Sequence, residues 1–383
     1  MYSMNSNYSR RTLLKIITGG VFSIAASLFS RNGNSRKLKK MAKDNHSILS
    51  VTELPETGPW PTEDPFLFCV HHNDNYPAAK DDLSPNVSLS GRHLGNDFSN
   101  KDGWSMYHGQ KVPGFPRHPH RGFETLTVVS KGFIDHADSL GASARYGDGD
   151  AQWLTAGDGI NHSEMFPLFS QNGNNKLDFF QIWLNLPSYN KRVEPNFEMY
   201  WKDEIPKISS SLNGNKNVQV EIITGDYLDF SSPIAPKNSW ANNKKNDVAV
   251  WIIRLDRNGK FAIPNTKSGA KRNLYVLKGS NMEIGGQSIS GGSMVTLDSS
   301  KNTVLKNLGN KTKILMLQGV PINEPVVKYG PFVMNTRSEI EQAFYDYNKT
   351  EFGGWKWGNS DPVHGMEKEK FAKLINGNII KPS

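Results

Sequence analysis

Two short stretches of the chain carry paired side chains that can bind a metal ion. His118 and His120 are separated by one residue, and His162 and Glu164 repeat that spacing further along the chain. Side chains two positions apart on a β-strand project from the same face of the strand. Two such strands lying side by side would therefore offer three imidazoles and one carboxylate, a ligand set that divalent transition metals accept.

A second carboxylate competes for the fourth position at this site. Glu124 follows His120 at an even offset, so a strand continuing from the histidine would keep the carboxylate on the ligand face. We favour Glu164 as the ligand and expect Glu124 to orient the ligands by hydrogen bonding, without contacting the metal itself. The candidate wall residues of the pocket, each of which could equally be plain core, are Phe123, Trp153 and Met165.

The histidines are unevenly distributed along the chain. Nine of the ten lie at or before His162, and the tenth is His364. Residues 163–363 contain neither histidine nor cysteine, so that half of the chain cannot hold a histidine metal site. Taken singly, the other histidines are expected to be solvated or hydrogen-bonded. The long polar segment at residues 73–113 has the features of a functional loop or lid, and it could place His72 and His108 at the mouth of the site.

The segments around the paired ligands have the patterns of β-strands. Residues 125–130 are rich in strand-forming side chains. Residues 177–186 alternate between a wholly apolar face and a mixed face, and Pro187 ends the pattern. A second block of short strands separated by glycine turns begins at residue 248. Repeated short strands of this kind predict a β-sandwich or a barrel.

One helix is predicted near the end of the chain. Thr336 and Glu339 have the spacing of a capping box. The residues after them place apolar side chains at helical spacing, which predicts a stripe packed against the core. This stripe consists of Ile340, Ala343, Phe344 and Tyr347.

The basic charge of the chain is concentrated in its first segment. The formal net charge is +8, and residues 1–40 carry eight lysines and arginines with no acidic residue, so the remainder is formally neutral. A basic surface for phosphates is therefore not required, and no nucleic-acid partner is expected. The chain also lacks an apolar run of about 18 residues, which argues against a membrane-spanning helix.

Residues 1–40 are typical of an export signal followed by a basic linker. Arg10 and Arg11 precede a short, mildly apolar segment at residues 16–29, as in a twin-arginine signal. We therefore expect export in the folded state, most simply to the periplasm, whether or not the signal is then removed. The single cysteine, Cys69, cannot form an intrachain disulfide, and its apolar neighbours predict that it is buried.

Five sequence runs together resemble the pirin family of the cupin superfamily. The runs are HPHRGFET at 118–125, QWLTAGDGINHSEM at 152–165, WLNLP at 183–187, EPVVKYGPFVMNT at 324–336 and FGGW at 352–355. The resemblance implies an all-β fold of two cupin barrels, which are double-stranded β-helices, with a short C-terminal helix and tail. It implies iron in the N-terminal barrel, with His118, His120, His162 and Glu164 as ligands, and a C-terminal barrel without metal.

The resemblance also sets the expected domain organisation. Residues 41–190 would form the metal-binding barrel, residues 191–245 a connecting region and residues 246–335 the metal-free barrel, before a helix and tail at 336–383. The segment 71–113 looks longer than in compact members of the family. The leader argues against carrying over an intracellular role in transcription.

The resemblance to quercetinase-type pirins gives the first functional hypothesis. Four ligands leave open positions on a metal that prefers six, which suits binding of a substrate or dioxygen. A flavonol-like hydroxy-ketone would chelate Fe(II), and Glu164 would act as the catalytic base for its hydroxyl proton. Mn, Ni or Cu would accept the same ligands. The sequence does not reveal the oligomeric state.

Two other hypotheses stay open at this point. The metal and its redox state could set a surface that binds another protein, without catalysis. Alternatively, the metal could only stabilise the barrel. Metal stoichiometry combined with oxygen uptake on a panel of flavonols separates the enzymatic hypothesis from both.

Overall fold

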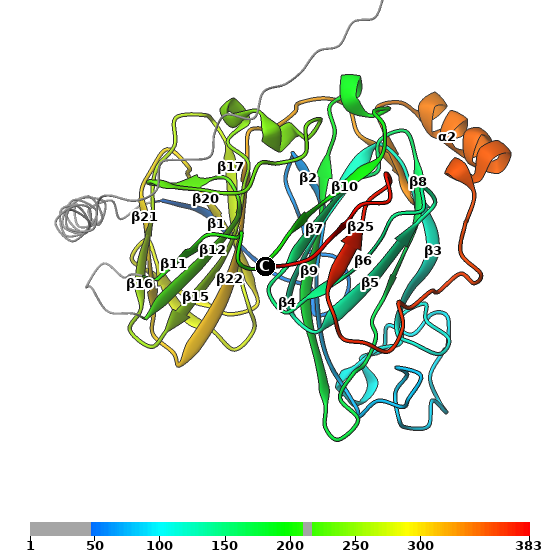
Figure 1. The fold of residues 1–383 in the computed structure, drawn as a ribbon. Helices are drawn as coiled ribbons and strands as arrows, with labels where there is room; N and C mark the ends of the chain where they lie inside the picture. The colour runs from blue at the N-terminus through cyan, green and yellow to red at the C-terminus, as the bar shows by residue number, and fades with distance from the viewer. Residues whose placement is uncertain (1–46, 210–216) are drawn as a thin grey trace, which may run out of the picture.

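The computed structural model describes residues 47–209 and 217–383 of the chain. The predicted export signal and basic linker at residues 1–40 lie outside these ranges. The described residues form two β-barrels that lie side by side, with one α-helix at an end of the N-terminal barrel (Figure 1). The predicted all-β fold of two cupin barrels with a short C-terminal helix is confirmed. No described helix has the length and apolar character needed to cross a membrane.

The N-terminal barrel is built from two facing sheets. The first sheet has the order β10 (Asn196–Tyr200), β7 (Ala151–Thr155), β4 (Phe123–Lys131), β9 (Asn175–Asn185) and β2 (Phe66–Tyr76). The second has the order β26 (Ile379–Ile380), β25 (Phe371–Lys373), β6 (Ser143–Gly147), β5 (Phe133–Asp138), β8 (Ile160–Met165) and β3 (Gly114–His120). Every strand pair in both sheets is antiparallel, so short turns can connect neighbouring strands.

The C-terminal barrel repeats this plan. Its larger sheet has the order β1 (Ile48–Glu53), β20 (Ser293–Leu297), β17 (Lys271–Val276), β22 (Lys311–Gly319), β15 (Ala249–Asp256), β12 (Val218–Thr224) and β11 (Lys207–Ile208). Its smaller sheet has the order β16 (Lys260–Ile263), β21 (Thr303–Asn307), β18 (Asn281–Ile284) and β19 (Gln287–Ser290). Two small hairpins complete the strands: β13 (Asp226–Tyr227) with β14 (Phe230–Ser231), and β23 (Val327–Tyr329) with β24 (Phe332–Met334).

The first described strand belongs to the C-terminal barrel, and the last strands belong to the N-terminal barrel. This differs from the expected domains at residues 41–190 and 336–383. Strand β1 joins the C-terminal barrel, where Thr52 lies opposite Met294 of β20. Strand β25 joins the N-terminal barrel, where Ala372 lies opposite Ala144 of β6. Strands β11 and β12, expected in the connecting region, also belong to the C-terminal barrel. Alternation of apolar and polar residues along a segment predicts that the segment is a strand. The strand that it pairs with depends on contacts with residues far away in the sequence.

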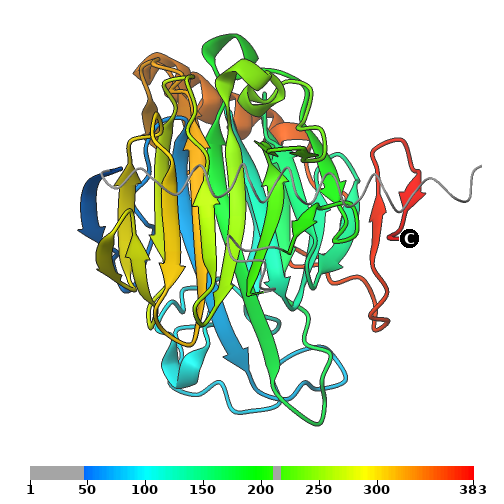
Figure 2. The same ribbon diagram turned by 90° about the vertical axis from the view of Figure 1, so that its left-hand side faces the viewer.

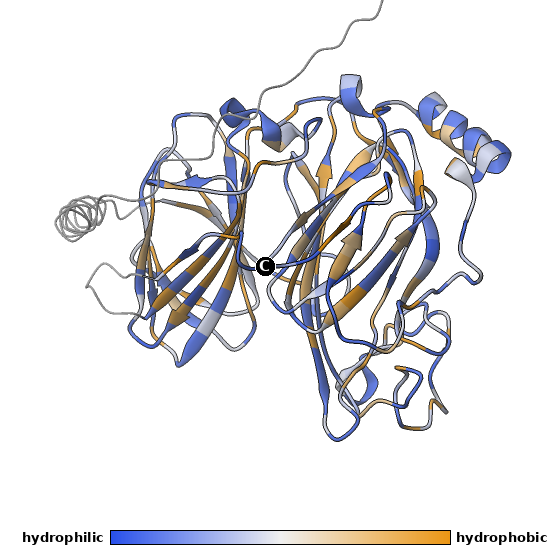
Figure 3. Cartoon of the chain, in the orientation of Figure 1, coloured by the Kyte–Doolittle hydropathy of each residue, from blue (hydrophilic) through white to orange (hydrophobic). Residues whose placement is uncertain are grey.

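The two barrels pack back to back through a shared apolar core. Leu126 of β4 and Ile182 of β9 lie in one buried cluster with Ile252 of β15 and Leu315 of β22. Apolar residues follow the strands of both barrels, whereas much of the helix surface is polar (Figure 3). Because the apolar face of β9 meets the other barrel, its mixed face is turned to the inside of the N-terminal barrel.

The helix α2 (Arg337–Thr350) begins with the predicted capping box, in which the Thr336 side chain accepts from the Glu339 amide and the Glu339 carboxylate accepts from the Thr336 amide. Arg121, next to His120, donates to Asp346 of α2 at 2.7 Å and so ties the helix to the end of β3. In both views α2 and the long connection from β2 to β3 lie at opposite ends of the barrel (Figures 1 and 2).

Candidate metal centre

Three of the predicted ligands meet because β3 and β8 are antiparallel neighbours. His118 lies opposite His162 in this pair, and their ring centroids are 4.4 Å apart. His120 is on the same face of β3 as His118, with its ring centroid 4.9 Å from that of His162. One ring nitrogen from each histidine lies within 4.8 Å of the other two. The structure therefore brings the three imidazoles together on the inside of the barrel.

These imidazoles are held in the neutral form that binds metals. Burial lowers the pKa of His118 to about 4 and lowers the pKa of His120 and His162 well below the usual value. The His118 Nδ1 atom lies 2.8 Å from the Pro116 carbonyl oxygen, which holds a proton on Nδ1 and leaves the Nε2 lone pair available.

The unpaired nitrogens at this site fit a metal ion. Within residues 47–209 and 217–383, both ring nitrogens of His162 and Nδ1 of His120 are buried without a hydrogen-bond partner. A buried polar atom without a partner costs about 1–3 kcal/mol. Each neutral imidazole has one lone pair, and a divalent cation that accepts it offsets part of the cost, so the three histidines are able to hold such an ion.

Glu164 lies beside the three histidines and is held in place by two donors. Its Oε2 atom accepts from Gln181 Nε2 at 2.7 Å and lies 3.9 Å from His162 Nε2. Its Oε1 atom accepts from Thr127 Oγ1 at 3.3 Å. Burial raises the pKa of Glu164, with His136 and these two donors opposing the rise. The carboxylate is thus next to the histidine group, outside the set of three whose nitrogens lie within 4.8 Å.

Glu124 lies away from the site, contrary to its predicted role in supporting the ligands. Its carboxylate accepts from Thr155 Oγ1 at 2.8 Å and from Ser239 Oγ at 2.5 Å. Burial raises its pKa to about 7. The even offset from His120 was misleading because Gly122, with φ of +86°, turns the chain between β3 and β4 and breaks the alternation.

The three predicted wall residues have different positions. Phe123 is at the site, with its ring centroid 5.0 Å from that of His120. Trp153 packs instead in the core between the two barrels. Met165 directly follows Glu164, so alternation turns its side chain to the other side of β8. Trp153 and Met165 are buried, so for these two residues the alternative of plain core applies.

Sequence reasoning missed two residues that line the site from β9. Trp183 lies with its ring centroid 5.4 Å from that of His120, and Gln181 supports Glu164. The mixed face of residues 177–186 was the signal that could have identified them. Because one face of this strand is wholly apolar and packs in a core, the polar residues on its other face are candidates for lining a site.

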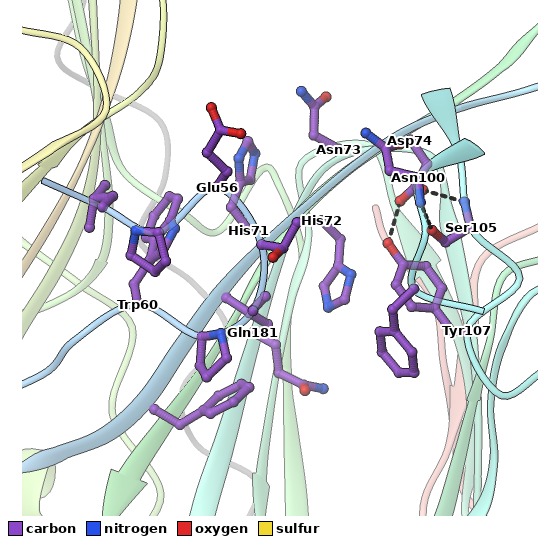
Figure 4. Close-up of a pocket in the computed structure, with 18 of the residues that line it drawn as sticks. Glu56, Trp60, His71, His72, Asn73, Asp74, Asn100, Ser105, Tyr107 and Gln181 are labelled. Atoms are coloured by element: carbon purple, nitrogen blue, oxygen red, sulfur yellow. Dashed lines mark hydrogen bonds between the residues drawn. The ribbon is translucent and has the colours of Figure 1, made fainter. Parts of the chain in front are cut away.

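A cavity of about 1960 Å³ opens from these residues. It passes around the edge strand β2 and reaches the other barrel at Lys278 and residues 290–293. His72 and His108 both line it, in the position expected for the mouth of the site. Figure 4 shows that the residues labelled around it come from β2, β9, the connection between β1 and β2 and the connection between β2 and β3.

The connection between β2 and β3 is an ordered wall of this cavity. Asp74 accepts from the Ser105 amide at 2.9 Å and from the Tyr107 hydroxyl at 2.8 Å (Figure 4). Asp97 accepts from Arg92 at 2.9 Å and from the Met106 amide at 3.0 Å. Two buried carboxylates thus tie the loop to β2 and to itself, as expected for a functional loop rather than coil.

Comparisons with known proteins agree with this architecture. Residues 60–184 match a family model described as Pirin, and residues 250–353 match one described as Pirin C-terminal cupin domain. The human protein named Pirin is 32% identical over 253 residues, which cover 64% of this chain and 80% of that protein.

Two further relatives carry the name of an enzyme. A Pseudomonas aeruginosa protein, provisionally named quercetin 2,3-dioxygenase, is 32% identical over 243 residues, covering 63% of this chain and 80% of that protein. A crystal structure titled as quercetin 2,3-dioxygenase from Acinetobacter baumannii superposes with a TM-score of 0.63 at 25% identity, covering 80% of this chain and 98% of that one.

Proposed function

Because the chain belongs to the pirin family of cupin proteins, we propose that it is a metal-dependent dioxygenase similar to quercetinases, acting on a flavonol-like hydroxy-ketone. The observation that carries the proposal is the group of three neutral imidazoles beside a large cavity, two of them buried with unpaired ring nitrogens. A site that only stabilised the barrel would need no such opening.

His118, His120, His162 and Glu164 would hold the metal, for which Fe(II) is our first choice and Mn, Ni and Cu are alternatives. The bound ion would supply a Lewis acid for the two oxygens of the hydroxy-ketone and an electron source for dioxygen.

Glu164 would accept the substrate's hydroxyl proton. Its burial raises its pKa, which makes it a stronger base than an exposed glutamate. Gln181 Nε2 and Thr127 Oγ1 orient the two carboxylate oxygens, so the atom that receives the proton is fixed in position.

Aromatic side chains would exclude water and hold the flat part of the substrate. Trp183 lies next to His120, and Phe115 lies next to His118 with ring centroids 6.3 Å apart; both line the cavity, and Phe123 packs behind Trp183. Apolar walls with few polar groups are typical of small-molecule sites.

The decisive experiment measures metal content and oxygen uptake with a panel of flavonols. Protein loaded with one equivalent of Fe(II) is expected to consume oxygen only when a flavonol is added, and His162→Ala is expected to consume none. If the fully loaded protein shows no turnover with Fe, Mn, Ni or Cu, the enzymatic proposal fails and the non-enzymatic role in redox-dependent protein binding takes its place.

We also propose that the protein is exported by the twin-arginine route, on the basis of Arg10, Arg11 and the apolar segment after them. Replacing both arginines by lysine is expected to retain the protein in the cytoplasm, as measured by cell fractionation. Unchanged export of the double variant would contradict the proposal.

A further inference from the structure

His72 is a buried imidazole of the cavity for which the proposed chemistry has no role. It lies on β2, and only 6% of its surface is exposed. Its ring stacks on Phe179 with centroids 4.4 Å apart and meets the edge of Tyr107 at 4.8 Å. These contacts fix the plane of the ring, so its nitrogens have defined directions.

The ring nitrogens of His72 are free within the described parts of the chain. No hydrogen bond to either nitrogen is formed by residues 47–209 and 217–383. The other two cavity histidines outside the metal group each have a partner. His71 pairs with Asp178 at 2.9 Å, and His108 pairs with the Gly95 carbonyl at 2.7 Å. His72 thus differs from its neighbours in offering unused hydrogen-bonding capacity to the cavity.

The position of His72 suits a group on the far part of a ligand. Phe115 separates it from the metal group, with ring centroids 5.8 Å from His72 and 6.3 Å from His118. In Figure 4 the His72 ring lies between the side chains of Tyr107 and Gln181. A flat ligand bound at the metal by one end would present its other end to this imidazole.

The wall behind His72 is rigid. Asp74, two residues further along β2, holds the hydroxyl of Tyr107 and the amide of Ser105. Burial lowers the pKa of His72 to about 3, so the ring is neutral at pH 7 and carries one donor and one acceptor nitrogen. It can therefore accept from, or donate to, a hydroxyl without any change of charge.

We propose that His72 is a specificity-determining residue that forms a hydrogen bond to a second hydroxyl of the substrate, remote from the pair of oxygens that bind the metal. The substrate class is then a flat aromatic hydroxy-ketone with a further hydroxyl on its distal ring. This inference rests on the proposed function, because it assumes that a hydroxy-ketone occupies the metal.

The test compares two ligands and three proteins. 3-Hydroxyflavone carries the chelating oxygens and no other hydroxyl, whereas quercetin carries further hydroxyls. Anaerobic titrations with Fe(II)-loaded protein measure both dissociation constants without turnover. The wild-type protein is expected to prefer quercetin by about tenfold, the value of one well-placed hydrogen bond. His72→Phe is expected to remove that preference while keeping the affinity for 3-hydroxyflavone, and His72→Gln to restore part of it.

His93→Phe is the matched control, because His93 is exposed in the connection between β2 and β3 and does not line the cavity. It is expected to keep the tenfold preference. Circular dichroism and thermal melting of each variant establish that the fold is intact. An unchanged preference in His72→Phe overturns the inference.

The outcomes also separate this inference from the proposed function. If flavonols bind with the expected preference but no oxygen is consumed, the dioxygenase proposal fails and the role of His72 stands. If oxygen is consumed and His72→Phe keeps the preference, only the role of His72 fails. If neither flavonol binds the loaded protein, both are overturned.

Discussion

The two barrels of this molecule share a strand order but fill their interiors differently. The order β10-β7-β4-β9-β2 in the N-terminal barrel corresponds to β1-β20-β17-β22-β15 in the C-terminal barrel. In the smaller sheets, the pair β3–β8 corresponds to β16–β21. Where His118 faces His162 in the first barrel, Phe261 faces Leu305 in the second.

The contrast continues on the strands that face these pairs. The inner face of β9 carries Gln181 and Trp183, whereas the inner face of β22 carries Ile314 and Met316 in a closed apolar core. A small barrel is normally filled by side chains. The C-terminal barrel follows that rule, and the N-terminal barrel replaces part of its filling with imidazoles, a carboxylate and a cavity. The same backbone plan therefore supports either a core or a site, depending on a few inward positions.

The largest expected effect comes from removing one histidine of the N-terminal pair. His120→Ala is expected to lower metal affinity by more than about 100-fold, since even groups that only support ligands contribute 10–100-fold. Elemental analysis of the purified protein measures this, with His93→Ala as the control that retains metal. Full metal content in His120→Ala would show that the two barrels differ for a reason other than metal binding.

The corresponding change in the C-terminal barrel should affect stability and not metal. Leu305 is fully buried opposite Phe261, so Leu305→Ala is expected to cost about 2–5 kcal/mol of unfolding free energy. Urea unfolding measures the cost, and elemental analysis should find unchanged metal. Loss of metal from a folded Leu305→Ala protein would mean that the two interiors are coupled.

The boundary between the barrels should make stability depend on pH. Burial raises the pKa of Glu124 from its ordinary value of 4.5 to about 7, so the folded state keeps a proton that the unfolded state has released. The contribution of Glu124 to stability is therefore expected to fall by about 3 kcal/mol as pH rises from about 4.5 to about 7, with no further change above that. Buried histidines with lowered pKa values contribute in the opposite direction, so the quantity to measure is the difference in stability between the wild-type protein and Glu124→Gln at each pH. Glu124→Gln should remove this dependence in urea titrations at several pH values. The same pH dependence in the wild-type protein and in Glu124→Gln would show that Glu124 is ionised in the folded protein over this range.

The smallest expected effect concerns the residue that orients Glu164. Gln181→Met keeps the volume of this side chain and removes the hydrogen-bond donor to Glu164. The inner face of β9 then becomes more apolar, as the inner face of β22 is. Activity or metal affinity is expected to fall by about tenfold. If Gln181 sets the basicity of Glu164, the pH profile of turnover is expected to shift in this variant. If the role of Gln181 is only structural, the pH profile stays the same.

The sequence predicted the ligands better than their surroundings. The spacing of His118, His120 and His162 was informative because each pair lies within one strand, where alternation holds. Glu124 was misplaced because the turn at Gly122 begins a new strand with its own phase. Strand partners such as β1 with β20 could not be predicted, because pairing depends on contacts between residues more than two hundred positions apart, as between Thr52 and Met294.

The exchange of strands between the barrels has a consequence for synthesis. β25 pairs with β6, the Ser360 carbonyl accepts from the Arg117 amide, and Ser360 also lines the cavity. The barrel with the candidate metal site is thus finished by residues translated after the whole of the other barrel. On the ribosome, nascent residues 114–165 must wait for residues 360–373 to emerge before the site is enclosed, so metal capture by the finished site follows translation of both barrels.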